Sequence, residues 1–156
     1  MSEAEVQYLD LELMERMCHR LAVALFDLTD DPITPFVQHN QGLLESALDL
    51  PRTAFQGKDM YPSLPAKAAV LWYTLNKNHP FGNGNKRISA ASLLVFLFIN
   101  DHWLDAGKTE IVNQSLRIAQ SAANERETLI SDLENWIGDH MITAEEASEF
   151  KDEEAA

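Results

Sequence analysis

The stretch His79-Pro80-Phe81-Gly82-Asn83-Gly84-Asn85-Lys86-Arg87 connects two segments of helical pattern near the middle of the chain. On its N-terminal side, Ser63 is a typical N-cap and predicts a helix that runs to Asn78. On its C-terminal side, a second helix is expected from about Asn85 to Ile99, and this segment is apolar almost all round from Ala90 onward. A helix that is apolar on every side belongs at the centre of a helical bundle, with the quoted stretch at its start.

Helical patterns also cover most of the remaining chain. Asp10 should cap the first helix, and the apolar face of that helix is predicted to hold Leu13, Met17, Leu21 and Leu25. Capping boxes are expected at Asn124 with Glu127 and at Thr143 with Glu146. The further predicted helices span residues 10–28, 41–50, 109–122 and 124–137.

The segments between these helices contain turn and loop signals. Two prolines and a polar cluster make residues 29–35 a loop, and residues 52–61 are expected to form a loop or a short hairpin. No internal repeat or linker interrupts the chain. We therefore predict an all-α fold with one domain over residues 1–142, followed by an acidic tail over residues 143–156 that is a frayed helix or disordered.

The charge of the chain is strongly negative but unevenly placed. The net charge is −13, which argues against general nucleic-acid binding because phosphate neutralisation needs a basic surface. Lys77, Lys86 and Arg87 nevertheless lie close together, with no acidic residue between them in the sequence. This local cluster favours the binding of one small anion.

Cysteine content and hydropathy narrow the class of protein further. The single cysteine, Cys18, lies in a helical pattern and is expected to be a core thiol rather than a nucleophile. The N-terminus lacks a signal pattern, and the longest nearly apolar run, Ile88–Ile99, is shorter than the roughly 20 residues that span a bilayer. The expected location is the cytoplasm, with no membrane contact.

The quoted stretch has the residue types of a phosphate cradle. Unpaired N–H groups and the dipole at a helix start attract anions, and glycines at 82 and 84 are expected to let the backbone turn with positive φ and approach a ligand. Lys86 and Arg87 add full positive charges. His79 could accept a proton from an attacking nucleophile, and Asn83 is an oxygen donor placed where a metal ligand would help. Phe81 between them is expected to be a buried anchor.

The pattern His79-x-Phe81-x-x-Gly84-Asn85-Lys86-Arg87 resembles the signature of the Fic/Doc family, H-x-F-x-[D/E/N]-[G/A]-N-[G/K]-R. Its N-K-R ending is similar to the Doc (death-on-curing) branch, whereas Fic proteins have G-N-G-R. The segment Gly42-Leu43-Leu44-Glu45-Ser46-Ala47-Leu48 and the following stretch Pro51–Gly57 resemble the corresponding segment and flap of Doc-like proteins. The resemblance covers about residues 8–105.

This resemblance implies a fold, an activity and partners. Fic proteins are helical bundles that transfer AMP from ATP to a hydroxyl. Doc is a toxin that transfers the γ-phosphate to a threonine of elongation factor Tu and so stops translation, and its antitoxin, Phd, silences it by binding as a peptide. The resemblance thus implies a protein-modifying transferase that uses ATP or another nucleoside triphosphate with Mg²⁺, and an antitoxin that inhibits it as a separate protein.

The same resemblance assigns roles to individual residues. His79 would be the general base, and Asn83 would be the Mg²⁺ position. Arg52–Tyr61 would be the flap that docks the target, by adding a strand to it. The phosphates would be held by Gly84, Asn85, Lys86 and Arg87.

Three functions remain open at this stage. Lys86 fills the room that a glycine gives to the inner phosphates in Fic proteins, which favours a Doc-like kinase. A nucleotidyl transferase of the Fic type is the alternative enzyme. Because many relatives carry a carboxylate where this chain has Asn83, the third alternative is an impaired Fic/Doc fold that acts by binding a partner. The sequence Ser121–Arg126 only approaches the inhibitory-helix pattern of some Fic proteins, so no internal inhibitor is expected.

Overall fold

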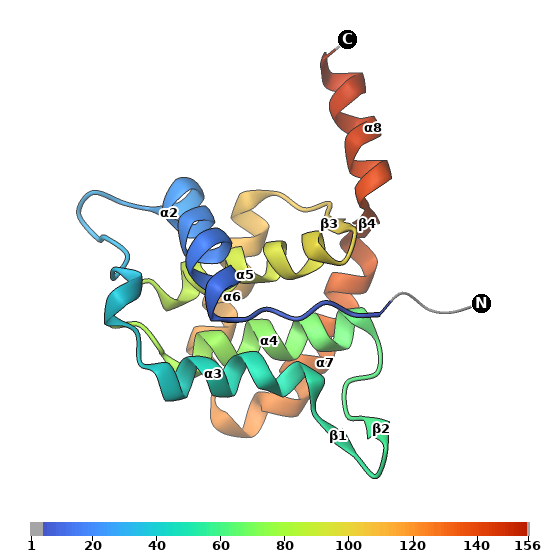
Figure 1. Cartoon of the computed structure of the whole chain (residues 1–156). Coiled ribbons are helices and arrows are strands. Elements are labelled where there is room, and N and C mark those ends of the chain that lie inside the picture. The colour runs from blue at the N-terminus through green and yellow to red at the C-terminus, as the bar shows by residue number, and fades with distance from the viewer. Residues whose placement is uncertain (1–4, 156) are drawn as a thin grey trace.

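Helices build almost the whole of the structure, a computed structural model that describes residues 5–155 (Figure 1). Two helices form its centre, α4 (Leu64–Asn78) and α5 (Asn85–Ile99), and they pack against each other. Both bury most of their residues, so side chains from the other helices surround them on most sides. The all-α fold with a central buried helix is therefore confirmed.

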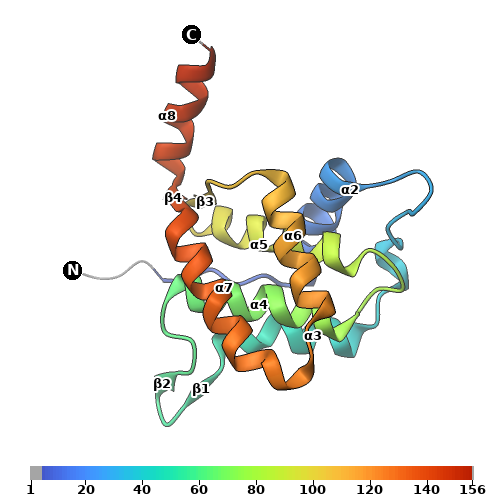
Figure 2. The ribbon, with the colours of Figure 1, turned by 180° about the vertical axis from the view of Figure 1, so that it is seen from behind.

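The remaining helices lie on different sides of this central pair. α3 (Gln41–Asp49) packs on α4, while α6 (Lys108–Gln120) and α7 (Arg126–His140) lie together across the opposite face (Figure 2). The N-terminal helix packs on α5 and consists of α1 (Leu11–Leu13), a π-helical turn (Met14–His19) and α2 (Arg20–Phe26). Short 3₁₀ turns cover residues 36–38, 50–52 and 123–125.

The most buried positions of the N-terminal helix lie one residue beyond the predicted ones. Its fully buried side chains are Met14, Cys18, Ala22 and Phe26, at a regular spacing of four. Leu13, Met17 and Leu21 are half-buried and pack against the core beside them, whereas Leu25 is exposed, so the prediction was wrong for Leu25. The small side chains of Cys18 and Ala22 let this helix lie close against α5, where the Ser92 hydroxyl contacts the Met14 sulfur at 3.7 Å.

Most predicted helix starts carry the expected caps. Asp10 accepts from the Leu13 N–H at 2.8 Å, and Ser63 accepts from the Ala66 N–H at 3.1 Å. The capping box of Thr143 with Glu146 forms in both directions and starts α8 (Ala144–Ala155), which projects from the body (Figure 1). The predicted box of Asn124 with Glu127 was wrong. A 3₁₀ turn precedes α7, and the Glu125 carboxylate accepts instead from the Ala122 N–H at 2.9 Å.

Two small hairpins complete the fold. β1 (Ala54–Phe55) and β2 (Lys58–Asp59) form a hairpin whose turn has positive φ at Gln56 and Gly57. The open alternative of a loop or hairpin for residues 52–61 is thus decided in favour of a hairpin. β3 (His102–Leu104) pairs with β4 (Met141–Thr143), which brings the segment before α6 beside the end of α7. Within residues 5–155, no helix is long and apolar enough to cross a membrane.

Candidate active site

His79 ends helix α4 in a left-handed conformation, with φ 50° and ψ 54°. A left-handed residue at this position turns the chain sharply away from the helix axis, so the His79 side chain is exposed beside the start of α5. Its ring Nδ1 lies 3.3 Å from the Asn85 amide nitrogen, and Nε2 has no hydrogen-bond partner within the described residues. The imidazole is thus placed by α4 and left accessible.

Asn85, the first residue of α5, ties the motif loop to that helix. Its Oδ1 accepts from the Phe81 N–H at 3.0 Å, and its Nδ2 donates to the Phe81 carbonyl at 2.7 Å. These two bonds fix the orientation of the amide, so the contact with His79 Nδ1 also comes from an amide N–H. In neutral His79 this contact favours the proton on Nε2. Nε2 can act as a base only in the other tautomer, after the long 3.3 Å contact has opened.

Phe81 is the anchor of the loop. Its side chain is 2% exposed, which confirms the predicted burial. The ring packs near an aromatic cluster below the loop, with centroid separations of 5.8 Å to His19 and 6.1 Å to both Phe36 and His39. In addition, the Asn40 N–H donates to the Pro80 carbonyl at 2.7 Å. The motif loop therefore rests on packed side chains and does not hang free.

Gly84 provides the conformation that starts α5. Its φ is +92°, and a Cβ at this position would lie 3.0 Å from Ile33 Cγ1, so both torsion and space require glycine. Gly82 does not have positive φ, so that part of the prediction was wrong. The first helical bond runs from the Ile88 N–H to the Gly84 carbonyl at 2.8 Å. The N–H groups of residues 85–87 precede it and have no acceptor within the helix.

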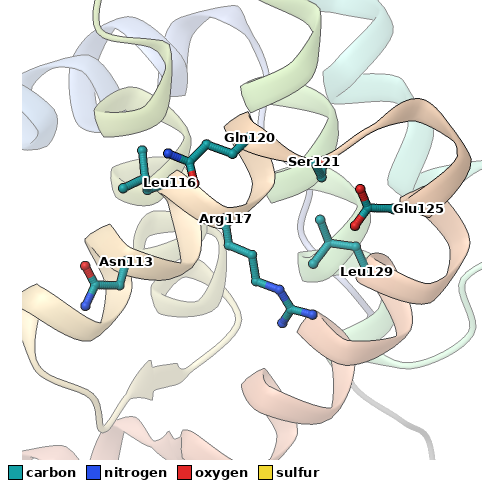
Figure 3. A pocket seen from close by; sticks show the side chains of 7 residues that line it. All are labelled: Asn113, Leu116, Arg117, Gln120, Ser121, Glu125 and Leu129. Atoms are coloured by element: carbon teal, nitrogen blue, oxygen red, sulfur yellow. The ribbon is translucent and has the colours of Figure 1, made fainter.

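A groove of about 380 Å³ lies beside the motif. It is lined by the catalytic candidate His79, by the motif residues from Gly82 to Lys86, and by Leu116, Ala119 and Gln120 of α6. A second groove of about 440 Å³ shares Leu116 and Gln120 with the first and continues between α6 and α7 (Figure 3). There Arg117 extends from α6 towards α7 and forms an ion pair with Asp132 at 2.8 Å.

The three cations that the sequence groups together have different partners. Lys77 donates to the carbonyls of Ala119 and Ser121, at 3.4 and 2.6 Å, and so caps the C-terminus of α6. Arg87 points to the loop before α3, where its Nη2 lies 3.3 Å from an oxygen of the Asp31 carboxylate. Lys86 is exposed and lines the groove. Within the described residues, the groove beside His79 therefore receives its cationic side chain from Lys86.

Asn83 is held by the same loop before α3. Its Nδ2 donates to Asp31 Oδ1 at 2.5 Å and to the Pro32 carbonyl at 2.8 Å. Because both acceptors lie at the nitrogen, the amide oxygen is the atom left for a ligand. The roles of Asn83 as a metal position and of Gly84, Asn85, Lys86 and Arg87 as phosphate ligands remain predictions.

Sequence reasoning missed two parts of this site. Asp31 and Thr34 contact the motif from a loop that has only the composition of a turn, and nothing in their spacing indicates that contact. The α6 residues Leu116 and Gln120 carry no chemical signal of their own, and only the packing of α6 on α5 brings them to the groove. No group of three or more histidine, cysteine or acidic side chains in the described part of the chain could hold a metal.

Comparison with known proteins identifies the family. A curated protein named toxin Doc, from Mycolicibacterium smegmatis (strain ATCC 700084 / mc(2)155), is 44% identical over 59 residues. The aligned segment is 38% of this chain and 45% of that protein, so it spans less than half of the relative's length. No solved structure matches. The model of the Fic/DOC family matches residues 2–97, which is more than half of the chain and includes the whole motif. The chain belongs to the Fic/DOC family.

Proposed function

We propose that this protein is a Doc-like toxin of a toxin–antitoxin pair, which transfers the γ-phosphate of a nucleoside triphosphate to a protein hydroxyl. The observation that carries the proposal is that His79, the start of α5 and Lys86 line one groove. The His79 imidazole, which can act as an acid or base, and the anion-binding start of α5 thus face the same groove. The similarity to toxin Doc over 59 residues supports the assignment as a toxin.

In the proposed reaction, His79 transfers the proton, while the start of α5 and Lys86 stabilise the phosphate. The hydroxyl oxygen of the target forms a bond to the γ-phosphorus while the bond from that phosphorus to the β–γ bridging oxygen breaks, and the nucleoside diphosphate leaves. His79 takes the hydroxyl proton at Nε2, in the tautomer that carries its proton on Nδ1. The N–H groups at the α5 start and the Lys86 ammonium stabilise the phosphate charge.

The residues present fit Mg²⁺ only as an ion held mainly by the nucleotide. Mg²⁺ keeps several waters and is usually bound through substrate phosphates with one or two protein oxygens. The Asn83 amide oxygen, left open by the bonds of its nitrogen, would supply such a protein ligand. When bound, the ion would neutralise phosphate charge.

Resemblance within the family extends the proposal to partners. The target would be a threonine of elongation factor Tu, and its modification would inhibit translation. The β1–β2 hairpin suits the predicted docking of a target strand, because it stands away from the body and its Phe55 is 69% exposed. Inhibition would come from an antitoxin protein that binds in trans.

One specific observation favours the alternative of an impaired binding module. Position 83 carries a neutral amide whose nitrogen is bound to Asp31, and Arg87 is bound to Asp31 as well. The Arg87 guanidinium, which family resemblance assigns to the phosphates, is thus engaged by a protein contact, and the amide oxygen at position 83 is a weaker ligand for a hard cation than a carboxylate. A nucleotidyl transferase of the Fic type remains the enzyme alternative, and Lys86 in the groove argues against it by taking the space of the inner phosphates.

Labelled ATP separates the three functions. The protein is incubated with purified elongation factor Tu, and in parallel with a bacterial lysate, using ATP labelled either at the α or at the γ position. We expect γ label on protein and no α label. Label from the α position would identify a nucleotidyl transferase, and the absence of both, with ATP still bound, would identify the binding module.

A further inference from the structure

The segment Asp27–Thr34, between α2 and α3, is docked along the motif loop. Thr34 and Asn83 exchange two hydrogen bonds, from the Thr34 N–H to the Asn83 carbonyl at 3.1 Å and from the Asn83 N–H to the Thr34 hydroxyl at 2.7 Å. The side chain of Ile33 is buried against Gly84, and its N–H is bound by the Asp27 carboxylate at 3.2 Å. This segment is therefore part of the wall of the site.

Asp31 is the charged residue at the centre of this contact. One carboxylate oxygen accepts from the Asn83 amide at 2.5 Å, and the other lies 3.3 Å from Arg87 Nη2. Arg87 Nη1 also donates to the Asp31 carbonyl at 2.7 Å and to the Phe26 carbonyl at 3.4 Å. Asp31 thus contacts both Arg87 and Asn83, the two side chains of the motif that point towards the Asp27–Thr34 segment.

The direction of Arg87 differs from that of its neighbour Lys86. Successive residues of an α-helix point about 100° apart, so these two side chains leave α5 on different sides. The Arg87 side chain is 13% exposed and does not line the groove, whereas Lys86 is exposed and does. The two terminal guanidinium nitrogens of Arg87 make three contacts with this segment and with the Phe26 carbonyl just before it.

We propose that Asp31 is a positioning residue of the site. It clamps Arg87 and Asn83 to the Asp27–Thr34 segment, so that Lys86, rather than Arg87, is the side-chain cation that meets a phosphate in the groove. The clamp also fixes which atom Asn83 presents, because its amide nitrogen stays on Asp31 while its oxygen has no hydrogen-bond partner among residues 5–155. The part concerning phosphate rests on the proposed function, whereas the clamp does not.

Hydrogen exchange tests the clamp on the full chain without nucleotide. In Asp31→Asn and in Arg87→Met, the backbone amide hydrogens of residues 27–34 should exchange about three- to tenfold faster than in wild type. This is the effect expected when a partly exposed charged contact is lost. The matched control is Asp30→Asn, which makes the same charge change at an exposed neighbour. The double variant D31N/R87M should exchange no faster than R87M, because the two residues act as one unit. Unchanged exchange in D31N and R87M would overturn the clamp.

ATP titration tests which cation meets the phosphate. Lys86→Met should weaken ATP binding about tenfold or more, because a charge-assisted hydrogen bond is lost. Arg87→Met should weaken it less than about threefold, and D31N should bind ATP within about threefold of D30N. The proposal is overturned if R87M loses as much affinity as K86M, or if D31N binds ATP at least about tenfold more tightly than D30N, since either result puts Arg87 on the phosphate.

These two measurements separate the inference from the function on which it partly rests. If R87M does not fold, the comparison of D31N with D30N still decides both questions. A wild-type protein that binds no ATP would refute the proposed function, and the exchange measurement would then decide the clamp by itself.

Discussion

Asn85 bonds both backbone groups of Phe81, accepting from its N–H at 3.0 Å and donating to its carbonyl at 2.7 Å. Phe81 is buried, and Asn85 is 6% exposed. These two hydrogen bonds close the loop between α4 and α5. They also keep the Asn85 amide in contact with the His79 ring. The position of the catalytic candidate therefore depends on Asn85.

The first prediction concerns this closure. Asn85→Ala leaves a buried N–H and a buried carbonyl of Phe81 without a partner, which should lower the free energy of unfolding by about 1–3 kcal/mol per group. Chemical denaturation measures the loss. Asn78→Ala is the control, because Asn78 makes one exposed bond to the Leu43 carbonyl, and its loss should stay below about 1 kcal/mol. Equal losses in the two variants would show that Asn85 does not close the loop.

The start of α5 gives a second prediction. In Gly84→Ala, the alanine would have to adopt positive φ, and its Cβ would lie 3.0 Å from Ile33. This strain should lower the free energy of unfolding by about 1–3 kcal/mol and weaken ATP binding. Gly107→Ala adds a Cβ that meets nothing within 4 Å at a residue without positive φ. That variant should keep wild-type stability and affinity. A Gly84→Ala protein with wild-type values in both measurements would contradict the geometry described for the helix start.

The third prediction uses the buried thiol. Burial raises the pKa of Cys18 from 9.0 to about 12, which supports its interpretation as a core thiol. Above pH 9 the unfolded chain releases this proton while the folded protein keeps it, so Cys18 lowers the free energy of unfolding by up to about 1.4 kcal/mol per pH unit. This contribution is fully present below pH 9 and is lost as the pH rises.

Comparison of wild type with Cys18→Ala between pH 8 and pH 11 isolates that contribution from other titrating groups. The difference in unfolding free energy between the two proteins should shrink as the pH rises above 9. A difference that stays constant over this range would mean that the folded thiol ionises as readily as an unfolded one.

Much of this architecture can be predicted from local pattern, because caps and apolar runs act over a few residues. The limits of α4 and α5, the cap at Ser63 and the burial of Phe81 follow from such patterns. The partners of Lys77 and Arg87 do not, because they lie on α6 and before α3, far along the chain. The shift of the most buried positions of the first helix by one residue has a related cause. Leucine positions show which residues are apolar, whereas close packing on α5 selected the smaller Cys18 and Ala22.

A fourth prediction separates the two enzyme alternatives through Lys86. Lys86→Gly removes the groove's cationic side chain and enlarges the space at the α5 start. Transfer of γ-phosphate should fall about tenfold or more, because a charge-assisted contact is lost, and some α-linked nucleotide should appear on the target. Product analysis with α- and γ-labelled ATP measures both changes. If product and rate both stay at wild-type values, Lys86 does not select the reaction.

The rate of γ-phosphate transfer to elongation factor Tu, measured for wild type and His79→Ala, decides whether His79 and the α5 start form one phosphoryl-transfer site. We expect a fall of about 10²–10⁴-fold in His79→Ala, with ATP affinity within about threefold of wild type, because the base is lost while the phosphate contacts remain. Near-normal transfer by His79→Ala would remove His79 from the reaction, since the groove would then hold nucleotide without using its histidine.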